Sequence, residues 1–353
     1  MRRITKKRNG YINIIKFENI DIFRSGEDIS QIRLSIFVKS EAGTADLKSR
    51  ARLILKLSRA HFLVPGALLY TLGSTLAQLR GVVCPPERLI FGYSVFFFAH
   101  LSVSFSNDYR DRHSDRRAVR TFFSGGSGVL LEHRELEKTA FRIALILLAL
   151  SALAALAFTI TYGYGAAFLI FAVSGGLLGW FYSAPPLKLS YRGLGEAATA
   201  LAAGLIMPGM GYFVVSGQLD LWFGLLSVPL ILYGLYFILT VEIPDYEADR
   251  AARKMNLVTR IGVKKASYVT LAAAISGTGI LALLHFSGFA AGVFDLSKLV
   301  ILSSLPLAAA SASLLACMTG GLSIVNQTVL KMAGLLAFLS GSVLVLSFEL
   351  ILG

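Results

Sequence analysis

Two acidic clusters stand out because their spacing would place several carboxylates on one face of a helix. The first follows the pattern N-D-x-x-D-x-x-x-D and contains Asn107, Asp108, Asp111 and Asp115. In a helix its three aspartates stand at i, i+3 and i+7, where like charges repel one another. A hard divalent cation relieves this repulsion, because carboxylate oxygens are the ligands that Mg²⁺ takes. The cluster is therefore a candidate magnesium site.

The second cluster is a D-x-x-x-D pair, Asp245 and Asp249, at i and i+4. Each cluster directly follows an apolar run, residues 89–105 for the first and 219–241 for the second. Mg²⁺ is usually held by one or two carboxylates plus the phosphates of a substrate. Two such clusters facing each other would bind a diphosphate bridged by metal ions. The alternative is that each is a solvated, charged helix end, and the repetition of the pattern favours the metal site.

The composition predicts that helices in a membrane position these clusters. Hydrophobic residues make up 55% of the chain and charged residues 16%. Apolar runs of about 20 residues indicate transmembrane helices. We predict an all-α, polytopic membrane protein, with a polar tail over 1–58 and a nine-helix transmembrane domain over 59–353. The expected spans are about 60–80, 86–106, 139–160, 165–183, 193–216, 219–241, 266–286, 296–318 and 328–352.

The formal net charge of +13 is interpreted as loop charge that sets orientation, and not as a nucleic-acid-binding surface, since no soluble basic fold surrounds it. Residues 1–58 are polar and basic and lack the apolar region of a signal peptide. We expect a cytoplasmic tail, disordered or lying on the anionic membrane surface. The two cysteines, Cys84 and Cys317, show neither a disulfide framework nor zinc spacing.

Lys and Arg are distributed asymmetrically between the loops. The loops near 107–138, 184–192 and 242–265 are rich in both, whereas those near 161–165, 217–218 and 287–295 contain neither. Cytoplasmic loops carry the excess of positive charge. We therefore expect the tail and both acidic clusters on the cytoplasmic side, in a prokaryotic inner membrane, and the C-terminus on the other side.

The loop between the fourth and fifth expected spans is a third candidate segment. Its paired prolines, Pro185 and Pro186, favour an extended turn. Four of its residues could contact a substrate diphosphate through a hydroxyl or a positive charge: Tyr182, Ser183, Lys188 and Arg192. The alternative is an ordinary positively charged cytoplasmic loop.

With these features the chain resembles the UbiA superfamily of intramembrane prenyltransferases, over about residues 52–350. The resemblance rests on the nine spans and on the segments Asn107-Asp108-x-x-Asp111-x-x-x-Asp115, Tyr182-Ser-x-Pro-Pro-Leu-Lys188, Gly193-Leu-Gly-Glu196 and Asp245-x-x-x-Asp249. Two departures concern the flanks of the acidic clusters. Arg253 and Asn256 stand where the family often has glycine and threonine, around a matching Lys254, and residues 120–125 lack the family's proline.

The resemblance implies a bundle with a central cavity open to the cytoplasm, in which Mg²⁺ assists transfer of a polyprenyl group from its diphosphate to a small aromatic acceptor. It implies a metal site formed by Asn107, Asp108, Asp111, Asp115, Asp245 and Asp249, with the five aspartates as catalytic residues. It also adds Asn107 and Lys254 to the substrate-binding residues Tyr182, Ser183, Lys188 and Arg192.

The Asn-Asp-Tyr start of the first cluster and the glycine-rich stretch after it resemble quinone-type members, including 1,4-dihydroxy-2-naphthoate prenyltransferases. This resemblance favours a role in menaquinone- or ubiquinone-type quinone biosynthesis. Acceptors of chlorophyll-type or ether-lipid synthesis remain alternatives.

Two other classes of membrane protein fit less well. A CDP-alcohol phosphotransferase needs a D-G-x-x-A-R element, which nothing after Asp111 supplies. A transporter more often places its carboxylates at the midplane of the membrane, whereas these follow the ends of spans.

Aromatic and histidine side chains give weaker indications. A carbocation formed during transfer would be stabilised by aromatic walls, for which the candidates are Tyr70, Phe97, Phe98, Phe105, Phe181 and Tyr236. Ordinary packing within the spans is the more frequent role of such residues. The five histidines, His61, His100, His113, His133 and His285, show no metal-ligand spacing.

The charge asymmetry makes orientation testable by cysteine labelling. We expect Arg117→Cys to react with a membrane-impermeant thiol reagent only after cells are permeabilised, and Gly353→Cys to react in intact cells. Ready labelling at position 117 in intact cells, with none at the C-terminus, would contradict the orientation.

Overall fold

The computed structural model describes residues 48–112, 116, 123 and 126–352. Contacts divide the chain into residues 1–51 and residues 52–353, and the second unit forms the helix bundle. Within the described ranges the regular structure is helical, with no β-strand. Asp115 and residues 1–47 of the N-terminal tail lie outside the described residues.

Nine helical segments of the described chain are long and apolar enough to cross a membrane, which confirms the expected number. They are Ala60–Leu79, Pro86–Asp111, Arg134–Tyr162, Ala166–Ser183, Gly195–Ser216, Leu221–Glu242, Val263–Phe286, Ser297–Thr319 and Ile324–Leu352. The second span is longer than expected. It continues to Asp111 instead of ending near 106, so the described part of the first acidic cluster is helical.

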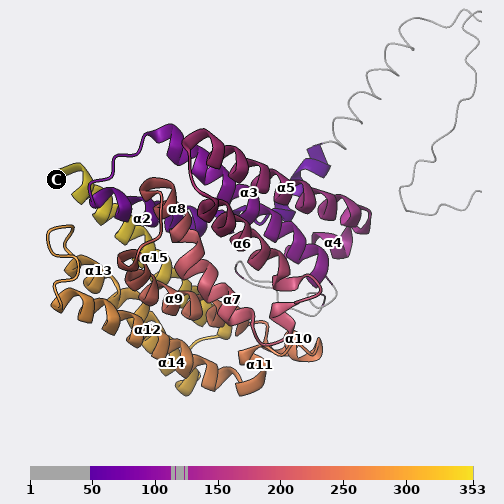
Figure 1. The fold of residues 1–353 in the computed structure, drawn as a ribbon. Helices are drawn as coiled ribbons and strands as arrows, with labels where there is room; N and C mark the ends of the chain where they lie inside the picture. The colour runs from indigo at the N-terminus through magenta and orange to yellow at the C-terminus, as the bar shows by residue number, and fades with distance from the viewer. Residues whose placement is uncertain (1–47, 113–115, 117–122, 124–125, 353) are drawn as a thin grey trace, which may run out of the picture. The chain divides into compact units, whose positions relative to one another are not determined.

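Figure 1 shows how these segments are divided into helices. The longer elements are α2 (Leu63–Leu79), α3 (Pro86–Asp111), α5 (Glu137–Tyr162), α6 (Ala166–Ser183), α8 (Met207–Ser216), α9 (Leu221–Glu242), α12 (Val263–Phe286), α14 (Ser304–Thr319) and α15 (Ile324–Leu352). The shorter elements are η1 (Ala60–Phe62), α4 (Val129–Glu132), η3 (Arg134–Leu136), η4 (Leu189–Tyr191), α7 (Gly195–Leu201), η5 (Ala202–Ile206), α10 (Tyr246–Ala251), α11 (Leu257–Ile261) and α13 (Ser297–Leu302).

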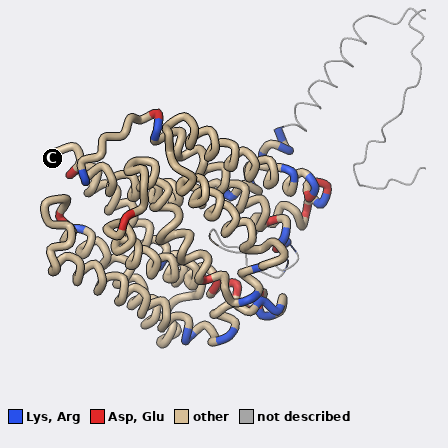
Figure 2. The backbone as a smooth tube through the Cα atoms, viewed as in Figure 1, with Lys and Arg blue, Asp and Glu red and all other residues tan. Residues whose placement is uncertain are grey.

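The helices pack mainly as neighbouring pairs, α3 with α5, α2 with α8, α9 with α12, and α14 with α15. A core of buried side chains joins α2, α8, α9, α12 and α15, and includes Leu72, Tyr212, Phe223, Leu281 and Phe338. Outward-facing positions remain apolar, as a lipid environment requires. Figure 2 shows the charged residues gathered mostly at the ends of the helices, with long uncharged stretches between them.

The fifth span changes its helix type at its centre. Its residues Ala202–Ile206 form a π-helical turn, η5, between α7 and α8. Pro208 follows within the first turn of α8 and has no N–H to donate, which removes one α-helical hydrogen bond and favours the local change of pairing. Gly204 lies in this turn, where an added Cβ would be 2.2 Å from the backbone N of Ile231. The turn therefore brings the span close to α9.

Helices α2 and α8 approach each other at two glycines. A Cβ added at Gly73 would lie 1.8 Å from the carbonyl oxygen of Pro208, and one at Gly211 would lie 1.9 Å from that of Tyr70. Membrane helices use small residues to allow such close backbone contact. Since the obstructing atoms are backbone, no side-chain rotation can make room.

We expect Gly211→Ala to destabilise the bundle, because overpacking of this kind costs about 1–3 kcal/mol. Thermal unfolding of the detergent-solubilised protein, followed by size-exclusion chromatography, would show a lower midpoint and a lower folded yield. Gly279→Ala is the matched control, because an added Cβ at this position in α12 meets nothing within 4 Å. Equal midpoints for the two variants would contradict the close packing of α2 and α8.

Candidate active site

A cavity of about 360 Å³ lies among the helices and receives residues from both acidic clusters. Asn107, Asp108 and Asp111 come from the C-terminal end of α3, and Asp245 and Asp249 come from the segment that follows α9. Tertiary structure thus brings together five of the six predicted metal-binding residues. The sixth, Asp115, lies outside the described residues.

Asp108 is held by the segment that precedes α4. The Ser127 backbone N–H donates to Oδ1 of Asp108 at 3.1 Å, and the Ser127 hydroxyl donates to Oδ2. Asp108 is only 5% exposed, so these two donors take the place of the water molecules that a carboxylate loses on burial. Ser127 belongs to the glycine-rich stretch after the first cluster, which therefore contributes to the site.

Asp111 is held by the loop between the fourth and fifth spans. The hydroxyl groups of Ser183 and Tyr191 each donate to it at 2.7 Å. Asn107 lies one helical turn earlier, and its buried Oδ1 has no hydrogen-bond partner among the described residues. A buried amide oxygen without a donor is available to a cation.

The second cluster lies just beyond the end of α9. Ile243–Asp245 interrupt the helix at Pro244, and Asp245 becomes the residue before α10. The predicted i, i+4 relation is nevertheless kept, because the Asp249 N–H donates to the Asp245 carbonyl at 2.8 Å. Both carboxylates consequently face the cavity from one turn of chain.

Asp249 has two partners of its own. The Lys254 Nζ lies 3.0 Å from Oδ1, and the Asn256 side-chain amide donates to Oδ2 at 2.8 Å. Burial raises the pKa of Asp249 above its usual value, although Lys254 and Asn256 act in the opposite direction. A cation placed beside this carboxylate would offset the cost of burying its charge.

The donor set fits magnesium, although it is not a preassembled cage. Among the described residues no three His, Cys, Asp or Glu side chains are close enough to form a metal centre by themselves. The cavity instead offers oxygen ligands from two sides. Mg²⁺ commonly takes one or two carboxylates and completes its shell with substrate phosphates and water. The coordination shell of such a site would be complete only when the phosphates of a bound substrate supply the remaining ligands.

The predicted substrate-binding residues divide into three groups. Lys254 and Tyr182 line the cavity, whereas Ser183 is used to hold Asp111. Lys188 and Arg192 are exposed and are not among the residues that line the cavity. Lys188 has a left-handed backbone (φ 46°), in a turn closed by its N–H to the Ala184 carbonyl. The folding of this loop toward Asp111 brings Tyr191 inward instead.

Several residues of the site carry no distinctive sequence pattern. Arg59 precedes η1, lies over the Phe62 ring at 4.5 Å, and lines the cavity. Glu242, three residues before Asp245, also lines it, and its buried Oε2 has no partner among the described residues. A basic residue before a span and an acidic residue after one are typical of any cytoplasmic helix end, so the sequence could not separate these two from their neighbours.

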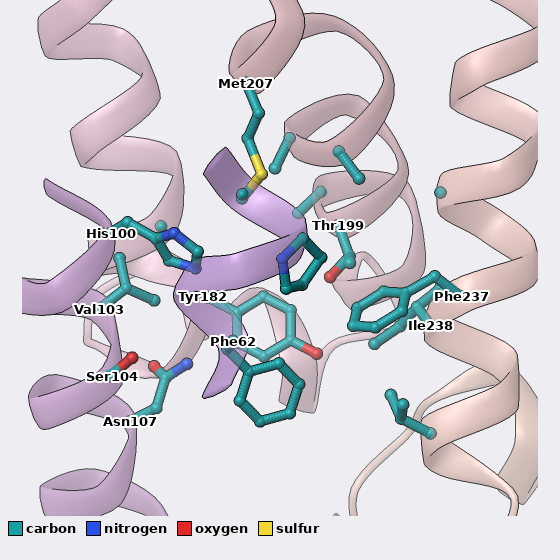
Figure 3. A pocket seen from close by; sticks show the side chains of 18 of the residues that line it. Phe62, His100, Val103, Ser104, Asn107, Tyr182, Thr199, Met207, Phe237 and Ile238 are labelled. Carbon is teal, nitrogen blue, oxygen red and sulfur yellow. The ribbon is translucent and has the colours of Figure 1, made fainter. Parts of the chain in front are cut away.

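The aromatic lining of the cavity differs from the expected one. None of the six candidates for a carbocation wall is among the lining residues, which instead include Phe62, Phe96, Phe123, Tyr182, Tyr233 and Phe237. Figure 3 shows Phe62, Tyr182 and Phe237 in the cavity, opposite Val103 and Asn107 of α3. Candidates such as Tyr70 and Tyr236 are packing residues, and Tyr236 donates to the Lys331 carbonyl.

The fold and the cavity define a multi-pass membrane protein with an acidic site inside its helix bundle. The model of the UbiA prenyltransferase family matches residues 67–319. The chain therefore belongs to the UbiA prenyltransferase family, and it is an intramembrane prenyltransferase.

Known proteins agree with this assignment. The chain is 24% identical to a 1,4-dihydroxy-2-naphthoate octaprenyltransferase of Bacillus subtilis, over 67% of this chain and 74% of the relative. It has the fold of a UbiA homologue from Archaeoglobus fulgidus solved with GPP and Mg²⁺, with a TM-score of 0.58, 18% identity, and coverage of 82% of this chain and 99% of that one. A structure described as digeranylgeranylglyceryl phosphate synthase matches with a TM-score of 0.56, 18% identity, and coverage of 84% and 99%.

Removal of one carboxylate from each cluster tests the site. We expect Asp111→Asn and Asp249→Asn to reduce the transfer rate about a hundredfold or more, since each removes a carboxylate that is expected to hold the metal. Folding should change little, because at position 111 the asparagine oxygen accepts from one hydroxyl and its amide group donates to the other, and at position 249 the asparagine oxygen still accepts from Asn256.

Glu247→Gln is the matched control, since Glu247 is exposed on α10 and is not among the lining residues. Initial rates with purified protein, normalised to folded protein, make the comparison. Near-normal rates for both aspartate variants would show that neither carboxylate is needed for transfer.

Proposed function

We propose that this protein is a Mg²⁺-dependent prenyltransferase that moves a polyprenyl group from its diphosphate to a small aromatic acceptor in quinone biosynthesis. The observation that supports it most strongly is the convergence of the two acidic clusters on one cavity whose remaining walls are largely apolar. Such a cavity suits a substrate with a charged head and a hydrocarbon tail.

The metal would be held by oxygen atoms from both clusters. We assign this role to Asn107, Asp108, Asp111, Asp245 and Asp249, and by sequence pattern to Asp115. Bound Mg²⁺ neutralises diphosphate charge and so makes the diphosphate a better leaving group.

The chain's own cations would act beside the metal. Lys254 and Arg59 line the cavity, and either can pair with phosphate oxygens on which charge grows as the C–O bond breaks. Lys254 Nζ lies 3.0 Å from Oδ1 of Asp249, so a cation of the chain itself would stand beside one of the proposed metal ligands.

The apolar walls would bind the tail and exclude water from the cation that forms. Leu335, Leu336 and Leu339 of α15 and Ile206 of η5 supply hydrocarbon surface. The ring of Phe237, which lines the cavity, would present an electron-rich face that stabilises an allylic carbocation. Exclusion of water protects that cation from hydrolysis.

The quinone-type acceptor rests on the Bacillus subtilis relative, named as a naphthoate octaprenyltransferase. An ether-lipid acceptor is the second candidate, because the structure described as digeranylgeranylglyceryl phosphate synthase shares the fold at higher coverage. We favour the aromatic acceptor because the Bacillus subtilis relative is similar in sequence over most of both chains.

The location of the site would follow from the charge distribution. Lys264, Lys265 and Arg260 lie close after the second cluster in sequence, so the positive-inside tendency would put the mouth of the cavity on the cytoplasmic side, which we propose is that of a prokaryotic inner membrane. Residues 1–58 would form a basic cytoplasmic tail.

A product assay with metal depletion tests this function. Membranes that contain the protein would be incubated with prenyl diphosphates of several lengths and with 1,4-dihydroxy-2-naphthoate, 4-hydroxybenzoate or geranylgeranylglyceryl phosphate, and products identified by mass spectrometry. We expect a prenylated aromatic product, loss of it in excess chelator, and its return with Mg²⁺.

Membranes that contain Asp111→Asn serve as the background control. Undiminished transfer in chelator would contradict the role of the metal. A product formed from the glycerol phosphate alone would replace the aromatic acceptor by the ether-lipid one.

A further inference from the structure

One histidine lies inside the cavity, apart from both acidic clusters. His100 belongs to α3 and lines the same cavity as the carboxylates. It precedes Asn107 by seven residues, so it lies about 10 Å farther along the helix, away from the clusters. Figure 3 shows its imidazole in the cavity, between Met207 and Val103.

The imidazole of His100 makes no hydrogen bond with a described residue. Its Nδ1 is buried without a partner. The ring lies 5.3 Å from that of Phe96, and a Cβ added at Gly66 would be 2.6 Å from Nδ1. The absence of a side chain at Gly66 therefore provides the space that the imidazole occupies. A buried ring nitrogen without a partner costs free energy, which a ligand can recover.

Other unpartnered polar atoms in the cavity belong to the metal region. Oδ1 of Asn107 and Oε2 of Glu242 are buried without partners among the described residues, and both lie within one turn of an acidic cluster. Oxygen atoms there suit a cation. The imidazole lies two helical turns deeper and offers a donor and an acceptor of hydrogen bonds. Ser104, at i+4 on the same face, also lines the cavity.

The two substrates of the proposed reaction differ in what they offer at this depth. A prenyl diphosphate has hydrogen-bonding atoms only in its head, which the acidic clusters and Lys254 would hold through metal and charge. Its hydrocarbon tail cannot pair with an imidazole. An aromatic acceptor with a ring hydroxyl can donate to one ring nitrogen or accept from the other.

We propose that His100, with Ser104 beside it, forms the acceptor subsite and binds a ring hydroxyl of the acceptor. This inference rests on the proposed function and adds the residues that would hold the acceptor's hydroxyl. The acceptor ring then lies between His100 and the acidic clusters. Its hydroxyl bond fixes which ring carbon faces the prenyl donor.

The test is a comparison of Michaelis constants for the two substrates. His100→Leu keeps much of the side-chain volume and removes both hydrogen-bonding nitrogens. With 1,4-dihydroxy-2-naphthoate as acceptor, we expect the KM for the acceptor to rise about tenfold, as for the loss of one hydrogen bond in a buried site. The KM for the prenyl diphosphate should change by less than about twofold.

Two further variants separate binding from folding. His100→Gln keeps a donor and an acceptor and should restore part of the affinity for the acceptor. His285→Leu is the matched control, because His285 lies in α12 and is not among the residues that line the cavity. Thermal unfolding of each purified variant shows whether the bundle is intact.

A second comparison uses a monomethyl ether of the acceptor. The wild type should prefer the free hydroxyl, and His100→Leu should lose that preference. An unchanged acceptor KM in His100→Leu, or an equal rise in both KM values, would overturn the subsite while leaving the proposed function standing. Failure of the wild type to prenylate any hydroxylated aromatic would instead overturn the proposed function, and the subsite with it.

Discussion

The structure depends on the placement of several carboxylates inside a helix bundle that is otherwise apolar. Buried carboxylates without donors or counter-charges are costly in a membrane protein. Each of the three most buried aspartates has such partners from a different part of the chain: Ser127 at Asp108, Ser183 and Tyr191 at Asp111, and Lys254 and Asn256 at Asp249. The short loops at this end of the bundle are therefore parts of the site.

These partners explain how a site can be ready for a cation without being a closed cage. Hydroxyl and amide donors fix the direction of the carboxylates, and lone pairs remain on their oxygens. Like charges facing one cavity still repel one another, and the proposed cation with a diphosphate would remove that repulsion. The same arrangement would couple that cation to the substrate, because neither acidic cluster supplies a full coordination shell alone.

The remainder of the bundle gives the cavity its shape. Glycines at the contact of α2 and α8 bring two helices close together, and the π-helical turn η5 brings the fifth span against α9. Small residues such as Gly175, Gly176 and Gly179 of α6 lie along the lining. Close crossing holds the helices together at one level of the bundle, and small side chains line the cavity at another level. The interior therefore retains a volume that an isoprenoid chain can fill.

The sequence by itself determined the number of spans, the helical class and the two acidic clusters. These follow from local physics: apolar runs of about 20 residues cross a membrane as helices, and carboxylates at i, i+3 and i+4 share a face. The i, i+4 relation between Asp245 and Asp249 was predicted correctly, although Pro244 interrupts the helix just before Asp245. The membrane itself makes such predictions strong, because it leaves the backbone few alternatives.

Only the tertiary structure decided which side chains meet. Asp111 at the end of α3 and Asp249 in α10 line one cavity, and nothing local to either helix specifies that they meet there. The direction of the helix faces also decided that Phe96 and Phe237 line the cavity whereas Tyr70 and Tyr236 pack elsewhere, and that Lys188 stays exposed while Tyr191 turns inward. His100 had no metal-ligand spacing in the sequence, and its place beside Gly66 appears only when α2 and α3 are packed together. In a membrane, the side chains of a helix are apolar whether they face lipid or the protein interior. The hydrophobic pattern therefore does not reveal which face lines the cavity.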